Sequence, residues 1–153
     1  MGFGGSKVAP KVSLDPTVEL GTLHYFDGHG RAEFLRIMLW HRKVKFKDHR
    51  ISPQTWLKIK KDFPDGGLPC WQEADWKINE TNAVSIYLQK RLGIRESDPK
   101  TAWEIDATFD FIYTQWGKIG PTTIAKKIDA KHTEEYMKAS EAIMDLLDTK
   151  LAR

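Results

Sequence analysis

The stretch "TLHYFDGHGRAEFLRIML", residues 22–39, changes its periodicity in the middle. Its first five residues read as a short apolar strand, Gly28 and Gly30 follow, and a helix is predicted from Arg31 to Trp40. Apolar residues recur in that helix at the spacing of one face, beside three polar ones; the apolar set is Phe34, Leu35, Ile37 and Met38, and the polar set is Arg31, Glu33 and Arg36. A strand, a turn and an amphipathic helix in this order predict the start of an α/β layer.

The next segment repeats this order. Residues 44–51 alternate between polar and apolar side chains, as a half-buried strand does. Ser52 and Pro53 then read as the cap and the first position of a second helix. The chain is therefore predicted to add a second strand and a second helix to the same layer.

Two further strands and a third helix are predicted before Gly93. Residues 68–78 read as two short strands joined by a turn at Ala74-Asp75. A helix is predicted to begin at the cap Asn79 and to end at Gly93. Its predicted apolar face consists of Ala83, Val84, Ile86, Tyr87 and Leu88. The fold class is thus α/β with a mixed four-stranded sheet.

The chain beyond Gly93 differs in character. Residues 94–99 form a polar linker, and residues 100–153 read as two long helices of a partial all-helical domain. Two helices rarely make a stable core alone, so we expect them to pack on the first domain, residues 21–93, or on another chain. The first domain is preceded by residues 1–20, which lack a clear period and are expected to be an extension that is flexible or lies along a partner.

Composition limits the classes of partner. The 24 basic and 21 acidic residues leave a net charge of +3 without a long run of one sign, so neither nucleic acid nor an anionic membrane is expected as a partner. No apolar stretch approaches the roughly 20 residues of a membrane span. The single cysteine, Cys70, suits a reducing compartment such as the cytoplasm and is expected to be a buried packing residue. The five histidines have no metal-binding spacing, so no metal is expected.

The first residues also fit a loose acylation pattern. Met1-Gly2 followed by Ser6 matches the pattern for an N-terminal lipid. Bulky Phe3 counts against that interpretation, and a glycine-rich start without a lipid is favoured.

Four stretches between Thr22 and Gly93 resemble the glutathione transferase family. They are "LHYFDGHGRAEFLRIML", "DHRISPQTWLKIKKDFP", "GGLPCW" and "NETNAVSIYLQKRLG". The resemblance is greatest to the sigma class, which includes glutathione-dependent prostaglandin D synthases. It implies a thioredoxin-like, glutathione-binding domain followed by a shortened helical domain. Beyond Lys100 only the helical character is similar.

The resemblance implies a catalytic role for Tyr25. In the family, the tyrosine that ends the first strand points its hydroxyl at the sulfur of glutathione, and Tyr25 stands at that place. A free thiol has a pKa of roughly 8.5 and only the thiolate is a strong nucleophile, so a donated hydrogen bond would favour the reactive form. The alternative is that Tyr25 is a half-buried packing residue of the strand.

The resemblance also implies the residues that bind glutathione. Leu68 would pair its backbone with the tripeptide because the peptide before Pro69 is cis in the family, and Glu80 with Thr81 would hold the γ-glutamyl end. Trp56 and Lys60 would approach the glycyl end of the tripeptide, and Arg31 would lie near the tyrosine. The simpler alternatives are a capped helix start for Glu80-Thr81, an exposed amphipathic side chain for Trp56 and Lys60, and a charged helix end for Arg31.

One family feature has no clear counterpart. Family dimers lend an acidic residue across their interface to the ligand. Asp106 and Asp110 are candidates for it, but Tyr113 fills the position that would align with it.

Two functions follow from these residues. The first is a glutathione transferase that uses glutathione as co-substrate, attacks a small apolar electrophile and forms a homodimer. The alternative is a non-catalytic scaffold subunit of a larger heteromeric assembly. The retained Tyr25, Pro69 and Glu80-Thr81 favour the enzyme, and the short helical domain favours the scaffold.

Overall fold

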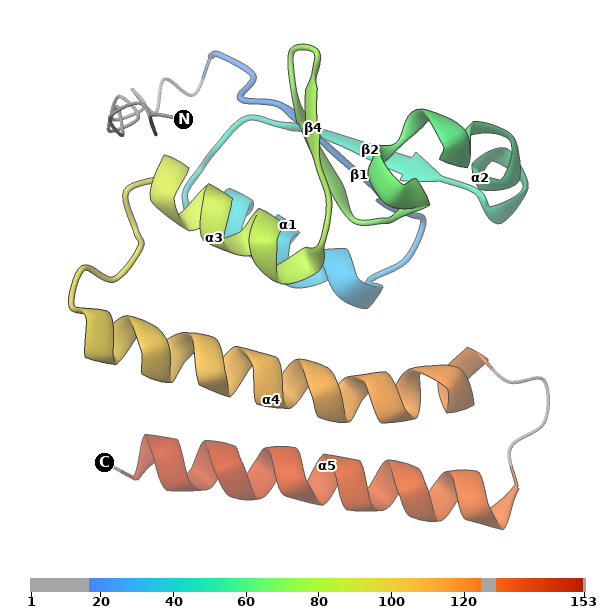
Figure 1. Cartoon of the computed structure of the whole chain (residues 1–153), viewed down its shortest axis with the longest axis vertical. Helices are drawn as coiled ribbons and strands as arrows, with labels where there is room; N and C mark the ends of the chain where they lie inside the picture. The colour runs from blue at the N-terminus through green and yellow to red at the C-terminus, as the bar shows by residue number, and fades with distance from the viewer. Residues whose placement is uncertain (1–16, 125–128, 153) are drawn as a thin grey trace, which may run out of the picture. The chain divides into compact units, whose positions relative to one another are not determined.

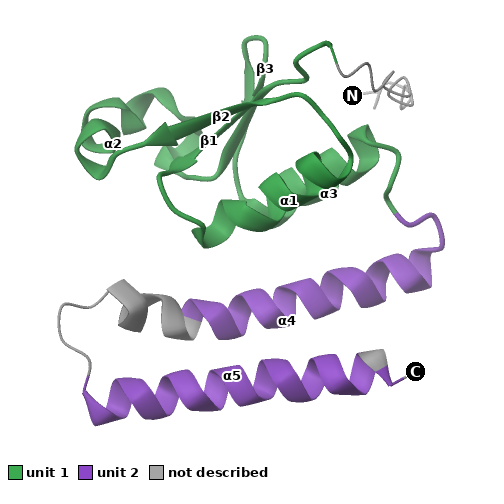
Figure 2. Cartoon of the chain, turned by 180° about the vertical axis from the view of Figure 1, so that it is seen from behind, with its two compact units in different colours: residues 1–95 green, residues 96–153 purple. Residues whose placement is uncertain are grey.

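The computed structural model describes residues 17–124 and 129–152, without the side chains of residues 118–124 and 151. The predicted acylation pattern and most of the predicted extension lie outside these residues. The chain divides into two compact units, residues 1–95 and residues 96–153 (Figure 2).

The first unit is built on a mixed four-stranded sheet, as predicted. Its strands are β1 (Thr22–Phe26), β2 (Lys47–Ile51), β3 (Cys70–Glu73) and β4 (Trp76–Ile78). The order across the sheet is β2-β1-β3-β4. β1 is parallel to β2 and antiparallel to β3, and β3 and β4 form an antiparallel hairpin. The turn of this hairpin lies at Ala74 and Asp75, where the sequence predicted it.

Helices connect and cover these strands (Figure 1). Their bounds are η1 (Gly30–Ala32), α1 (Glu33–His41), α2 (Pro53–Ile59), η2 (Lys60–Asp62), η3 (Pro64–Gly66) and α3 (Thr81–Arg91). The predicted cap of α2 is confirmed, because the Ser52 hydroxyl accepts a hydrogen bond from the Thr55 N–H. Gly93 follows α3 with a φ of 66°, a left-handed conformation that glycine adopts easily.

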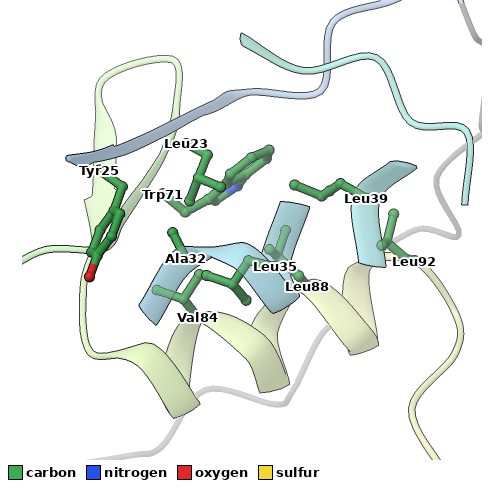
Figure 3. Packing of buried hydrophobic residues seen from close by; sticks show 9 residues of the cluster. All are labelled: Leu23, Tyr25, Ala32, Leu35, Leu39, Trp71, Val84, Leu88 and Leu92. Atoms are coloured by element: carbon green, nitrogen blue, oxygen red, sulfur yellow. The ribbon is translucent and has the colours of Figure 1, made fainter. Parts of the chain in front are cut away.

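The alternation of side chains along the strands creates two separate cores. Leu23 of β1 and Trp71 of β3 point to the face covered by α1 and α3, where they pack with Leu35, Leu39, Val84 and Leu88 (Figure 3). On the other face, Ile51, Phe63 and Cys70 form a smaller cluster beside Trp56 and Ile59 of α2. The sheet is therefore buried on both faces, and residues near the end of β1 lie between two helical layers.

Three details of the predicted helices are wrong. Asn79 does not cap α3; Glu80 occupies the N-cap position, and the Asn79 amide donates instead to the Pro64 carbonyl at 2.8 Å. In α1, Arg36 is fully buried and Ile37 is exposed, the reverse of the predicted pattern. Ala83 is exposed on α3, while Ser85 is buried.

The second unit consists of α4 (Pro99–Ile124) and α5 (Ala130–Leu151), which pack against each other. The Asp98 carboxylate accepts from the Thr101 N–H, and the Asp129 carboxylate does the same for the His132 N–H. The backbone of α4 continues past Gly120 and Pro121 to Ile124, and α5 begins at Ala130. Neither these helices nor any other helix in the described ranges is both long and apolar enough to cross a membrane.

Candidate functional site

Tyr25 lies at one end of the larger core. It is the fourth residue of β1, its side chain is 9% exposed, and it sits at the edge of the cluster around Trp71 (Figure 3). The backbone N–H of Arg31 donates a hydrogen bond to its hydroxyl oxygen at 2.9 Å. The residue is thus packed through its ring, while its hydroxyl is held by the turn that enters α1.

This turn approaches the tyrosine very closely at Gly30. A Cβ atom built on Gly30 would lie 2.6 Å from the Tyr25 hydroxyl oxygen, and the φ of Gly30 is 41°. A side chain at this position would both collide with the hydroxyl and strain the backbone. Glycine at residue 30 therefore permits the contact between Arg31 and Tyr25.

The hydrogen bond from Arg31 determines what the hydroxyl can do. Its oxygen accepts the N–H, so its own proton remains available to a second partner. Hydrogen bonds in a chain polarise one another, which strengthens a phenol as a donor. A thiolate placed beside this hydroxyl would receive a charge-assisted hydrogen bond.

The loop before β3 lies next to Tyr25 through the register of the sheet. His24 pairs with Cys70 at the end of the β1–β3 ladder, and Tyr25 and Pro69 are the residues just beyond this last pair on the two segments. The Leu68–Pro69 peptide is cis, as the resemblance implied. Leu68 is partly buried and packs against both clusters of the sheet.

The start of α3 is in contact with the loop that precedes β3. A Cβ atom built on Gly67 would lie 2.8 Å from the Asn79 amide nitrogen, so residues 67 and 79 are in close contact. Glu80 is exposed and has a φ of 68°, a region that is strained for a residue with a side chain. Thr81, the first residue of α3, is only 4% exposed. The N-terminus of a helix carries the positive end of its dipole, which suits a carboxylate ligand.

The three remaining predicted binding residues lie on the surrounding segments. The half-buried Trp56 ring packs edge to face against Phe26 and Phe63, with centroid distances of 6.0 and 5.2 Å. Lys60 is exposed at the start of η2, and the side chain of Arg31 is exposed at η1. The structure thus joins Tyr25 to Arg31 directly and packs Trp56 and Leu68 on one cluster, whereas Lys60 and Glu80 are exposed.

Arg36 is a residue of this region that the sequence pattern did not reveal. It is fully buried, and its Nη1 donates to the Gly28 carbonyl at 2.8 Å and to the Glu33 carboxylate at 3.0 Å. Its Nε donates to Asp48 on β2 at 3.1 Å. An arginine on an amphipathic helix usually predicts a solvated face, and only the distant Asp48 could have indicated otherwise.

A second buried polar group lies on the opposite face of the sheet. His24 contacts His49 through their Nδ1 atoms at 2.8 Å and Gln72 through its Nε2 at 3.0 Å. Burial lowers the pKa of His24 from 6.5 to about 4, so this imidazole is neutral near pH 7. Burial also raises the pKa of the Cys70 thiol to about 11, which agrees with a packing residue rather than a nucleophile.

The acidic candidates lie in the second unit. Asp106, Asp110 and Tyr113 are all on α4. Within the described ranges, no group of three or more histidine, cysteine or carboxylate side chains could hold a metal ion.

The chain is similar to glutathione S-transferases both in sequence and in structure. No family model matches the sequence. The chain is 32% identical over 88 residues to glutathione S-transferase P of Caenorhabditis elegans, covering 58% of this chain and 42% of that protein. It is 31% identical over 88 residues to the hematopoietic prostaglandin D synthase of Rattus norvegicus, covering 58% and 44%. The chain therefore spans less than half the length of these curated relatives.

Solved structures extend the similarity into the helical unit. A monomeric glutathione S-transferase from the hookworm Necator americanus matches with a TM-score of 0.76 and 25% identity, over 86% of this chain and 67% of that one. A prostaglandin D synthase from Nilaparvata lugens matches with a TM-score of 0.63 and 25% identity, over 80% and 59%. The relatives include several classes, so they do not single out the sigma class. In sequence over its first unit and in structure over most of its length, the chain is thus similar to glutathione S-transferases.

Proposed function

We propose that this chain binds glutathione and that Tyr25 stabilises the glutathione thiolate for attack on an apolar electrophile. The observation that carries the proposal is the Tyr25 hydroxyl, which accepts the Arg31 N–H and keeps its own proton for a sulfur atom. Glutathione would lose its thiol proton to solvent. The sulfur would then form a bond to an electrophilic carbon, whose leaving group or π electron pair would depart from that carbon.

The peptide part of glutathione would be held by backbone and helix groups. Leu68 beside cis-Pro69 would pair with the cysteinyl main chain, and the start of α3 at Glu80 and Thr81 would hold the γ-glutamyl end. The glycyl carboxylate would lie toward Lys60 and Trp56, where a cation suits an anion. Arg31 would place its positive charge near the thiolate.

The helical unit would supply the binding site for the second substrate or the interface with a partner. Apolar side chains are exposed there, including Trp103 at 66% and Met144 at 57%. They would line a site for an apolar electrophile or an interface with a second copy of the chain. A sigma-class type of enzyme, a homodimer and a cytoplasmic location remain our proposals.

The scaffold alternative is not favoured by the comparisons. Relatives named for an activity are transferases and prostaglandin D synthases. The alternative would gain support only if the chain failed to bind glutathione and was recovered from native extract within a stable heteromeric complex.

Calorimetry with glutathione tests the proposal. We expect binding in the micromolar to millimolar range, with proton release near neutral pH that S-methylglutathione does not show, because only a free thiol can ionise. Lys60→Met should weaken binding of both ligands about tenfold, as loss of an ion pair with a carboxylate does. Lys58→Met is the matched control, since Lys58 is exposed on neighbouring α2. No heat and no melting shift at several millimolar glutathione would contradict the proposal.

A further inference from the structure

We infer that Arg36 is a positioning residue for Tyr25: it fixes the turn from which the Arg31 N–H reaches the tyrosine hydroxyl. The inference deepens the proposed function and rests on it, because it names a residue that acts on the hydroxyl without touching glutathione. It concerns the contacts among Tyr25, Gly28, Arg31 and Arg36.

The first link is the hold of Arg36 on the turn. The guanidinium Nη1 donates to the Gly28 carbonyl at 2.8 Å, and Gly28 lies between Tyr25 and Arg31 in the chain. The same nitrogen also contacts Glu33 at 3.0 Å, at the start of α1. One buried cation therefore joins the middle of the turn to the helix that follows it.

The second link anchors Arg36 itself. Its Nε donates to Asp48 at 3.1 Å, on the strand that pairs with β1. Asp48 is in turn held by Arg50, whose Nε donates to it at 2.9 Å. Because β1 and β2 are hydrogen-bonded in parallel, this anchor fixes the turn relative to the strand that carries Tyr25.

The third link is the distance between Arg36 and the tyrosine. The guanidinium carbon lies 5.8 Å from the centroid of the Tyr25 ring, so the ring and the cation pack on one another. The Arg36 Nη2 is buried without a hydrogen-bond partner among the described residues.

A lysine at position 36 could not make the same set of contacts as Arg36. An ammonium group is a single point of charge on a flexible stem and cannot hold Asp48, Glu33 and the Gly28 carbonyl together in the fork of a guanidinium. Arg36→Lys should therefore keep a positive charge in the core but loosen the turn at Gly28. This variant therefore distinguishes a positioning role of the Arg36 guanidinium from an effect of its positive charge alone.

Hydrogen exchange of the ligand-free protein tests the inference directly. In Arg36→Lys, the Arg31 amide should exchange at least about tenfold faster than in the wild type, while the amides of β3 keep their rates. Arg91→Met is the matched control, because it removes a partly buried arginine from an ion pair with Glu73 elsewhere in the unit. An unchanged Arg31 rate in folded Arg36→Lys would overturn the inference.

A double variant shows whether the effect passes through the hydroxyl. Tyr25→Phe removes the acceptor of the Arg31 N–H, so this amide should already exchange faster in that variant. Adding Arg36→Lys should then accelerate it by much less than in the wild-type background. Equal acceleration in both backgrounds would show that Arg36 loosens the turn independently of Tyr25, against the inference.

Titration of bound glutathione separates this inference from the proposed function. If the wild type does not lower the pKa of the bound thiol, the proposed function fails, whereas the exchange rates still decide the role of Arg36. If the wild type lowers this pKa, Arg36→Lys should bring it back toward the free value.

If Arg36→Lys does not fold, Asp48→Asn is tested in its place. This variant weakens the contact that anchors Arg36 and should accelerate exchange of the Arg31 amide about threefold. An unchanged rate would overturn the inference.

Discussion

The backbone N–H of Arg31 donates to the hydroxyl oxygen of Tyr25 at 2.9 Å. This contact joins the end of β1 to the entry of α1 and fixes a phenol whose proton is available to a ligand. The chemistry that we propose depends on this one hydrogen bond and on the residues that permit it.

The first group to test is the hydroxyl of Tyr25. Tyr25→Phe keeps the ring that packs in the core and removes the donor to sulfur. We expect turnover with a generic electrophile to fall by about ten- to a thousandfold, the range lost with one preorganised donor. Glutathione affinity should change little. Steady-state kinetics with both substrates varied measures the two effects, and equal turnover in the variant would show that Tyr25 serves only packing.

Gly30 should be essential for the same contact. Gly30→Ala places a methyl group 2.6 Å from the Tyr25 hydroxyl and strains a backbone with a φ of 41°. We expect it to cost at least about 2 kcal/mol of unfolding free energy and to reduce turnover, because strain and overlap add. Gly28→Ala is the control, since nothing lies within 4 Å of its added Cβ. Urea unfolding of both variants checks this, and similar stabilities would contradict it.

The turn between β3 and β4 should gain stability from a glycine. Ala74 has a φ of 51°, a left-handed conformation that a Cβ disfavours. Ala74→Gly should therefore raise the free energy of unfolding by about 0.5 to 1 kcal/mol. Ala83→Gly, on the exposed side of α3, should lower it by about 1 kcal/mol. Effects of the same sign in the two variants would count against this assignment of the turn.

His24 should make the fold sensitive to mild acid. Its pKa falls from 6.5 to about 4 on folding because burial disfavours the imidazolium, so the unfolded chain binds more protons between these values. The contribution of neutral His24 to stability should be complete above pH 6.5 and should decline as the pH falls toward 4, by about 2 kcal/mol at about pH 5. Most carboxylates titrate below this window.

Unfolding of wild type and His24→Gln between pH 7 and 5 measures this effect. The variant should lose much less stability across the interval, because it lacks the titrating ring. His41→Gln is the control, since His41 is exposed on α1. Parallel pH profiles for wild type and His24→Gln would assign the acid sensitivity to another group.

Local periodicity predicted much of the first unit and little of its internal contacts. The strand at Thr22–Phe26 and the Ala74-Asp75 turn followed from alternation and turn chemistry. The burial of Arg36 did not, because it depends on Asp48, which the sheet brings near from another strand. Asn79 was wrongly predicted as a cap because its amide had a competing partner, the Pro64 carbonyl.

The candidate site was predictable only in part for a similar reason. The roles of Tyr25 and Pro69 came from resemblance to a family, since a tyrosine on a strand and a proline before one are common in any fold. The contact between Tyr25 and Arg31 depends on the left-handed Gly30, whose conformation a sequence pattern does not specify.

The most direct test of the central claim is the pKa of the thiol of bound glutathione, followed by thiolate absorbance in the wild type and in Tyr25→Phe. The account predicts a pKa at least about one unit below the free value of roughly 8.5 in the wild type, and a return toward that value in the variant. Binding of glutathione with the same thiol pKa in both proteins would contradict the claim that Tyr25 stabilises the thiolate.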